Sequence, residues 1–147
     1  MPPGVWITGV DALIKKMGHV RANEYLVKPM EESVLQVQAD MKEYPPPIAL
    51  RTWVKADGTT GEAIGQGYKR TGTLGRRWTK RVERHANGLT GRVGNNTEYA
   101  PWVQSSSFQA WMHRGRWQTD AQVLSQRRAW IVARFKRAID QALNRSA

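Results

Sequence analysis

The residues of this chain that could do acid–base or metal chemistry are few and scattered. Its three histidines are His19, His85 and His113. None of them stands at the HExxH, HxH or HxxxH spacing that metal sites favour. The carboxylates of the second half are Glu83, Glu98, Asp120 and Asp140. A metal-dependent nuclease needs clustered carboxylates to hold its cation. A His/Glu acid–base pair, such as His85 with Glu83 or Glu98, stays open, but no pattern selects it.

Other catalytic motifs are also missing from the sequence. The glycines of residues 65–67 and 71–73 match neither a P-loop nor a GxGxxG motif. The serines of residues 105–107 lack the GxSxG context of a hydrolase nucleophile. The chain has no Cys, which excludes disulfides, zinc–thiolate sites and thiol catalysis. We therefore expect a protein that is not an enzyme and that holds no cofactor or metal.

The strongest chemical signal is the positive charge between residues 68 and 104. This stretch holds eight Lys and Arg against two acids. Its main cations are Arg76, Arg77, Lys80, Arg81, Arg84 and Arg92. Cations beside an aromatic ring, here Trp78, are typical of proteins that bind nucleic acid without sequence preference. The same Arg side chains could instead pair with acidic residues of a neighbouring subunit. No RNP motif, zinc finger or convincing helix-turn-helix accompanies them, so sequence-specific recognition is not expected.

The net charge of +11 comes from the second half of the chain. Residues 1–68 hold seven Lys/Arg and eight Asp/Glu, a net of −1, whereas residues 69–147 hold sixteen and four, a net of +12. Such a field favours nucleic acid, acidic protein or anionic lipid, although a solvated basic surface is the simpler alternative. No segment approaches the roughly 20 apolar residues of a membrane span, and no signal peptide is visible. We expect a soluble chain without a membrane partner.

Helices at both ends of the chain must position these residues. A length of 147 residues with 40% hydrophobic residues suits a single domain over residues 1–147. A short helix is predicted to end near Met17. A second helix should reach about Glu43, either starting near Lys28 or running longer with a kink at Pro29. Residues 119–122 form a capping box that begins a C-terminal helix. The inner stripe predicted for that helix is Val123, Leu124, Ile131, Phe135, Ala138, Ile139, Ala142 and Leu143.

Between the helices the pattern predicts a β-hairpin with Asn87 and Gly88 as its two turn residues. In that register Val82 faces Val93, and a Glu–Arg pair forms between residues 83 and 92. Short strands are expected over residues 48–54 and 62–69, with a glycine-rich mobile loop over about 55–67. The segment over about 105–118 is long and irregular, which is typical of functional or disordered chain. Together these elements predict an α+β fold in which a small antiparallel sheet packs against the N-terminal helices and the long C-terminal helix.

Two motifs in this sequence resemble a known family. The first is Arg70-Thr-Gly-Thr-Leu74 followed by Arg-Arg-Trp at 76–78, and the second is Val93-Gly-Asn-Asn-Thr-Glu-Tyr-Ala-Pro-Trp-Val103. In order and spacing they resemble the head–tail joining and tail-completion proteins of long-tailed bacteriophages, over roughly residues 10–143. The chain departs from that family in a longer insertion at residues 51–66 and in the segment 109–119, which replaces an often Pro-rich stretch.

The resemblance implies a virion protein without enzymatic activity, assembled in the host bacterial cytoplasm. Such proteins form a ring, commonly of six subunits, in the tail or neck around the DNA path. Their partners are the portal or connector and the tail-tube or tail-terminator proteins, with non-specific contact to genomic DNA in the lumen. A closed ring needs a heterologous interface, in which different surfaces of the two subunits meet. The alternative function is a non-specific nucleic-acid-binding module that forms no ring.

The resemblance also suggests roles for single residues. Gly72 and Leu74 would form the turn into the hairpin, where glycine supplies backbone freedom and leucine supplies packing. Tyr99 and Trp102 would lie where neighbouring subunits meet, although burial in the core is the alternative for both rings. The wider Trp-rich surface, including Trp111 and Trp117, is a further candidate for the interface. The basic residues would face either the DNA or an adjacent subunit.

Overall fold

The computed structural model describes residues 19–46, 52–54, 56–62, 71–86 and 88–145. Its elements in chain order are α2 (His19–Lys42), β1 (Thr52–Val54), β2 (Thr60–Glu62), α3 (Thr73–Arg76), β3 (Trp78–His85), β4 (Gly88–Asn95), α4 (Ala100–Gln104), the 3-10 helix η1 (Trp111–His113) and α5 (Asp120–Arg145). The α+β fold with a β-hairpin and a long C-terminal helix is confirmed. The helix predicted to end near Met17 and the strand residues predicted over 48–51 and 63–69 lie outside the described residues.

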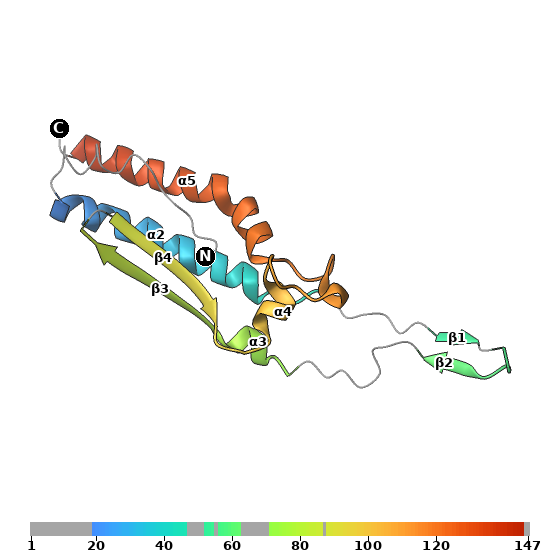
Figure 1. The fold of residues 1–147 in the computed structure, drawn as a ribbon. Helices are drawn as coiled ribbons and strands as arrows, with labels where there is room; N and C mark the ends of the chain where they lie inside the picture. The colour runs from blue at the N-terminus through green and yellow to red at the C-terminus, as the bar shows by residue number, and fades with distance from the viewer. Residues whose placement is uncertain (1–18, 47–51, 55, 63–70, 87, 146–147) are drawn as a thin grey trace.

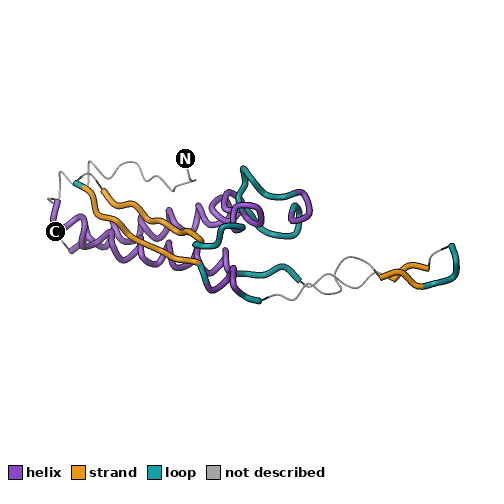
Figure 2. The backbone as a smooth tube through the Cα atoms, turned by 60° about the horizontal axis from the view of Figure 1, so that its bottom comes forward, coloured by secondary structure: helices purple, strands orange, loops and turns teal. Residues whose placement is uncertain are grey.

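Helix α2 is the centre of the main body (Figure 1), because it contacts both α5 and the β3–β4 hairpin. Figure 2 shows the two strands of that hairpin running side by side along the helices, and the small β1–β2 hairpin apart from them. The core forms where one stripe of α2 meets α5 and the hairpin. Its buried residues are Leu26, Met30, Val34, Val37, Met41, Val123, Ile131 and Phe135. Met30, Val34, Val37 and Met41 follow a helical spacing in the sequence, and all four lie in this core.

Helix α2 continues through a proline. It begins at His19 and holds Pro29 inside it, so the longer of the two predicted helices is the one that forms. Proline in a helix interior removes one backbone hydrogen bond. The buried side chains Leu26 and Met30 lie close to Pro29 in the helix and pack into the core. We attribute the tolerance of the proline to this packing, since most helical stability in proteins comes from the buried face.

Helix α5 begins at the predicted capping box. The Thr119 hydroxyl accepts a hydrogen bond from the Gln122 backbone N–H at 3.3 Å, and the Gln122 side-chain oxygen accepts one from the Thr119 N–H at 3.0 Å. Both bonds occupy donors that a helix start would otherwise leave free. Most of the predicted inner stripe of α5 is buried or partly buried, but Leu143 near the end of the helix is exposed.

The β3–β4 hairpin has a register two residues away from the predicted one. His85 pairs with Gly88, so Gly88 lies in the strand and Ala86 begins the turn; the predicted turn residue Asn87 lies outside the described residues. Val82 faces Gly91 rather than Val93. Side chains alternate between the two faces of a strand, so a shift of two residues leaves each one on its predicted face.

An ion pair joins the two long helices. The guanidinium of Arg127 in α5 donates to both carboxylate oxygens of Asp40 in α2, with Nη2 2.9 Å from Oδ1. Gln36 Nε2 donates to the same Oδ1 at 3.0 Å. Burial by itself would raise the pKa of Asp40, but the hydrogen bonds from Arg127 and Gln36 and the nearby positive charge hold it below the ordinary value. The carboxylate form is therefore the one that the fold stabilises.

Replacing Asp40 by asparagine should lower the free energy of unfolding at pH 7 by about 1.5 kcal/mol, a common value for hydrogen bonds to a charged group. The folded-state pKa of Asp40 lies below its unfolded value, so its contribution is present above the unfolded pKa and lost as the pH falls through the folded one. Urea unfolding at a series of pH values should show the difference from wild type shrinking in acid. Asp140→Asn, on an exposed face of α5, is the control. A difference that stays constant down to acid pH would show that the stabilisation does not come from the ionised carboxylate of Asp40.

Candidate functional site

The described histidines do not gather catalytic or metal-binding groups. His85 Nε2 lies 3.1 Å from Thr90 Oγ1 and 4.0 Å from Glu83 Oε2, on the exposed face of the hairpin. His113 packs edge-on against Trp117. Its burial and the charge of nearby Arg116 lower the pKa of His113. Over the ranges that the structure describes, no three His, Asp or Glu residues lie together as a metal site would require.

The six predicted basic residues do not form one patch. Arg81 and Arg92 are direct partners in the strand register, on the face of the hairpin turned away from the helices. Lys80 and Arg84 alternate with them and belong to the face that also carries Trp78, although both remain exposed. The two remaining cations, Arg76 and Arg77, are exposed at the end of α3 just before β3. The charge is thus divided between the two faces of the hairpin and its base.

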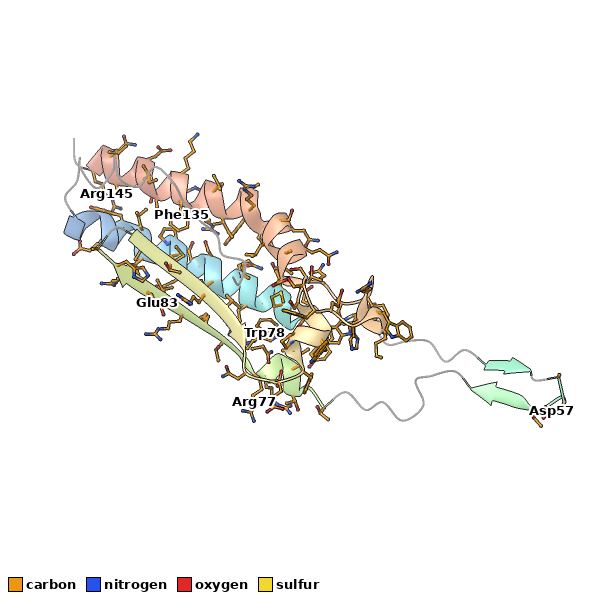
Figure 3. The ribbon with its side chains drawn as sticks, in the orientation of Figure 1. Asp57, Arg77, Trp78, Glu83, Phe135 and Arg145 are labelled. Carbon is orange, nitrogen blue, oxygen red and sulfur yellow. The ribbon has the colours of Figure 1, made fainter. Side chains whose placement is uncertain are left out.

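A single carboxylate joins the two opposed arginines. Glu83 Oε1 lies 3.4 Å from Arg81 Nε, and Glu83 Oε2 lies 3.2 Å from Arg92 Nε. Figure 3 labels Glu83 on the hairpin and Phe135 on α5. Like charges directly opposite each other destabilise a strand pair. Glu83 therefore acts as their common counter-ion, and the predicted Glu–Arg pair exists as a diagonal contact. Lys80 and Arg84 make no ion pair with a described acid, so they are more available to phosphate than Arg81 and Arg92.

The predicted turn residues have structural roles. Gly72 precedes α3 with φ of 70°, a left-handed conformation that favours glycine. Leu74 is buried in a second core with Ala100 and Val103. The Asn95 side chain donates to the Leu74 carbonyl at 2.7 Å, which ties this turn to the end of β4. Gly88 opens β4 with φ of 153° rather than occupying the turn itself.

Exposed aromatic and apolar side chains gather around α4 and η1. We define the aromatic knob as five large exposed residues: Tyr99, Trp102, Phe108, Trp111 and Met112. Trp111 is 77% exposed and Trp102 is 58% exposed. The Ala110 N–H donates to the Trp102 carbonyl at 2.7 Å, which brings the segment that carries Trp111 back onto α4. Tyr99 and Trp102 are therefore surface residues of this chain, and not the core residues of the alternative interpretation.

Trp117 does not belong to this surface, contrary to the prediction. It is 7% exposed and packs in the second core. Its ring meets Tyr44 edge-on, with ring centroids 5.0 Å apart. The large apolar area of the Trp ring is already covered by its own protomer, so it has little left to offer a neighbour. Trp117 instead packs against Ala100 and Val103 of α4, beneath the helix that carries Trp102.

Hydrogen bonds hold the irregular segment that carries the knob. The Gln109 side chain donates to the Val103 carbonyl at 2.8 Å and to the Trp117 carbonyl at 3.0 Å. The Gln109 N–H donates to the Ser105 carbonyl at 2.9 Å. At the start of α5, Asp120 Oδ1 accepts from the Ser106 N–H at 2.8 Å. The segment over 105–118 is thus an ordered structure with exposed aromatic side chains.

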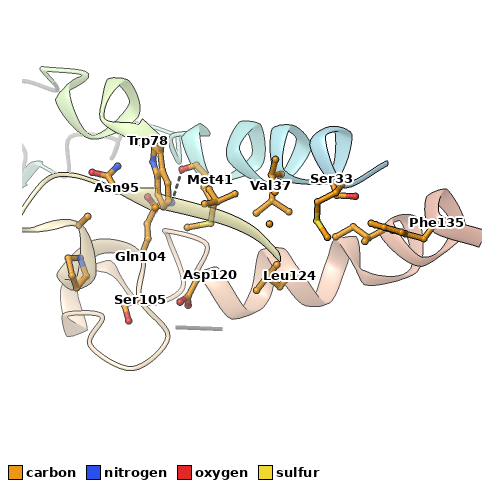
Figure 4. Close-up of a pocket in the computed structure, with 18 residues that line it drawn as sticks. Ser33, Val37, Met41, Trp78, Asn95, Gln104, Ser105, Asp120, Leu124 and Phe135 are labelled. Carbon is orange, nitrogen blue, oxygen red and sulfur yellow. Dashed lines mark hydrogen bonds between the residues drawn. The ribbon is translucent and has the colours of Figure 1, made fainter. Parts of the chain in front are cut away.

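An apolar groove runs between α2, β4, α4 and α5 (Figure 4). Its volume is about 240 Å³, and its walls include Val37, Val93, Leu124 and Phe135. Asp120 is the charged residue among those that line it. Two buried polar atoms of lining residues, Trp78 Nε1 and Gln104 Oε1, have no hydrogen-bond partner within the described ranges. The groove therefore combines an apolar wall with an unpaired donor and an unpaired acceptor.

The sequence pattern did not reveal the groove, Phe108 or Met112. Phe108 and Met112 lie in irregular chain, where no helical or strand period separates a buried side chain from an exposed one. The groove is made by α2, β4, α4 and α5, and the two long helices among them are far apart in the sequence. The composition of the segment was the available signal, since apolar residues in a long irregular stretch are often functional.

Neither the family models nor the curated proteins gave a match to this chain, and the search of the solved structures gave none either. Among the described helices, none is long and apolar enough to cross a membrane.

Proposed function

We propose that this protein is a structural virion component of a tailed bacteriophage, which forms a ring around the DNA path at the head–tail junction. The exposed aromatic knob is the observation that carries the self-association part. Contiguous apolar surface on a soluble protein typically marks an interaction site, and Trp and Tyr are enriched where binding energy concentrates. The two motifs that resemble head–tail joining proteins support the place in the virion.

The aromatic knob and the two motifs also support the proposed partners. Neighbouring copies form the ring, commonly of six subunits, and its two ends meet the portal or connector and the tail-tube or tail-terminator proteins. Lys80 and Arg84, the exposed hairpin cations on the face that carries Trp78, face the DNA in the lumen. They do so without reading its sequence, because phosphate contacts position a protein but carry no sequence information. Localisation in the virion neck or tail follows from this assembly.

The oligomeric state of the purified chain, without partners, tests this proposal. Light scattering during size-exclusion chromatography should show concentration-dependent self-association, and electron microscopy of the largest species should show closed rings. In such rings Lys80 and Arg84 of the hairpin should line the lumen. A chain that stays monomeric at all accessible concentrations would contradict the proposed ring. Rings in which these hairpin cations face the outer wall would contradict the proposed contact with DNA.

The alternative function is a nucleic-acid-binding module without a ring. It is favoured by exposed cations such as Lys80 and Arg84, which make no ion pair with any acid of the described residues. This alternative predicts tight binding of DNA by the monomer, with an affinity that falls steeply as salt rises. Replacing both residues by alanine should then reduce the slope of log affinity against log salt by roughly 2, about 1 for each lost phosphate contact. Under the ring proposal, free DNA binds the monomer weakly.

A further inference from the structure

We propose that the apolar groove receives the aromatic knob of a second copy of this chain, so that neighbouring copies join head to tail. This inference rests on the proposed ring function and names the two surfaces that would meet. A heterologous contact uses a different patch on each partner, which is the arrangement that a closed ring needs.

The groove has the features of a receptor for polypeptide. Gln104 is 3% exposed, and its Nε2 donates to the Met41 carbonyl at 3.0 Å, which fixes the orientation of the side chain. Its Oε1 is unpaired in the described structure, as is Trp78 Nε1. Native proteins rarely leave buried polar atoms without partners. Polypeptide carries both N–H donors and C=O acceptors, so an occupant of this kind can satisfy both atoms.

The knob has the features of a ligand for such a receptor. Among the described residues, Trp111 has the most exposed of the large apolar side chains. Its indole N–H is a donor of the kind that Gln104 Oε1 lacks. The hydrogen bonds of Gln109 order the loop before any partner arrives. An ordered loop avoids much of the entropic cost of binding.

Charge favours this pairing over one between two knobs. Residues 104–117 contain no acid and carry Arg114 and Arg116, so two knobs face to face would bring like charges together. The groove offers Asp120 as its charged lining residue. In a chain with a net charge of +11, a contact between copies needs such local complementarity. The knob therefore fits the groove better than it fits a second knob.

Two variants separate the two halves of the contact. Trp102→Ser with Trp111→Ser removes the two Trp rings of the knob, and Leu124→Arg fills the groove with a long cation. Each variant alone should self-associate at least tenfold more weakly than wild type in sedimentation measurements. An equimolar mixture should form a 1:1 complex, because it contains one intact knob and one intact groove. Circular dichroism checks the fold of each variant, and Ser105→Trp at another part of the groove lining replaces Leu124→Arg if that variant unfolds.

A disulfide can report the contact directly, because the natural chain has no Cys. Trp111→Cys in one chain and Leu124→Cys in another should give a crosslinked dimer when the two are mixed and oxidised. Val132→Cys is the matched control, since Val132 is exposed on the same helix but does not line the groove. Equal crosslinking to positions 124 and 132 would overturn the proposed pairing.

The outcomes distinguish this inference from the proposed function. A wild-type chain that forms rings, and whose association is unchanged by both variants, overturns the pairing of knob and groove but leaves the ring proposal standing. A wild-type chain that is monomeric at all accessible concentrations overturns both. Loss of association in both variants without a 1:1 complex in the mixture also overturns the pairing, because it indicates a symmetric contact or an indirect effect.

Discussion

Replacing Phe135 by alanine should lower the free energy of unfolding by about 3 kcal/mol, the lower end of the range for truncating a buried Phe. Phe135 is buried in the core that joins α5 to α2, and it also lines the apolar groove. The lower end applies because the groove lets neighbouring side chains and solvent reach the space that the ring vacates. Urea unfolding followed by circular dichroism would give this energy.

Val132→Ala is the matched control for Phe135→Ala. Val132 lies one turn of α5 away and is exposed. Its truncation should change the free energy of unfolding by no more than about 0.5 kcal/mol, as is usual for surface positions. Similar losses in the two variants would mean that α5 does not bury the face described here.

Replacing Gly91 by alanine should lower the free energy of unfolding by about 2 kcal/mol, within the range for overpacking a filled core. A Cβ at this position would lie 2.5 Å from Val34 Cγ1 and 2.7 Å from Met30 Sδ. Both distances are too short for carbon or sulfur contacts, so β4 and α2 would have to move apart. Thermal and urea unfolding of the purified variant would measure the loss.

Gly94→Ala provides the comparison on the same strand. A Cβ at Gly94 would meet nothing within 4 Å, so this variant should be neutral or slightly more stable, since alanine restricts the unfolded chain. Shortening the neighbour should also rescue the first variant: Val34→Ala combined with Gly91→Ala should cost less than the sum of the two. Additive costs would show that the clash with Val34 is not the cause.

The helices were predictable from local pattern. The capping box at residues 119–122 marks the start of α5, and a stripe at helical spacing marks the buried face of α2. Both signals depend on residues close together in the chain. The start of α2 was less certain, because Pro29 allows a helix that begins near it as well as one that passes through it.

The hairpin register was predicted two residues away from the observed one for a physical reason. An Asn–Gly pair favours a two-residue turn, and the predicted register also gave direct Val–Val and Glu–Arg pairs. The observed register instead places Gly91 opposite Val82 and against α2, where a residue with a side chain would collide with Val34. That constraint comes from the helix, so the pattern of the two strands could not reveal it.

The candidate site was predictable only in part. The sequence indicated an interface that includes Tyr99, Trp102 and Trp111, and the structure leaves all three on the surface. It could not separate them from Trp117, because burial of a Trp in irregular chain is decided by distant residues such as Tyr44. The division of the basic residues between the two faces of the hairpin does follow from strand alternation, once the strand is known.

The ordered loop around Gln109 has a consequence for when copies of this chain meet. If copies pair as proposed, the knob is already ordered in a single copy, so no folding of this loop has to precede the contact. Copies with a charge of +11 nevertheless repel each other at long range, which keeps encounters rare in dilute solution. A surface that holds several copies close together raises their effective concentration and removes this barrier. Ring closure would then be timed by the template on which the copies gather, and not by their synthesis.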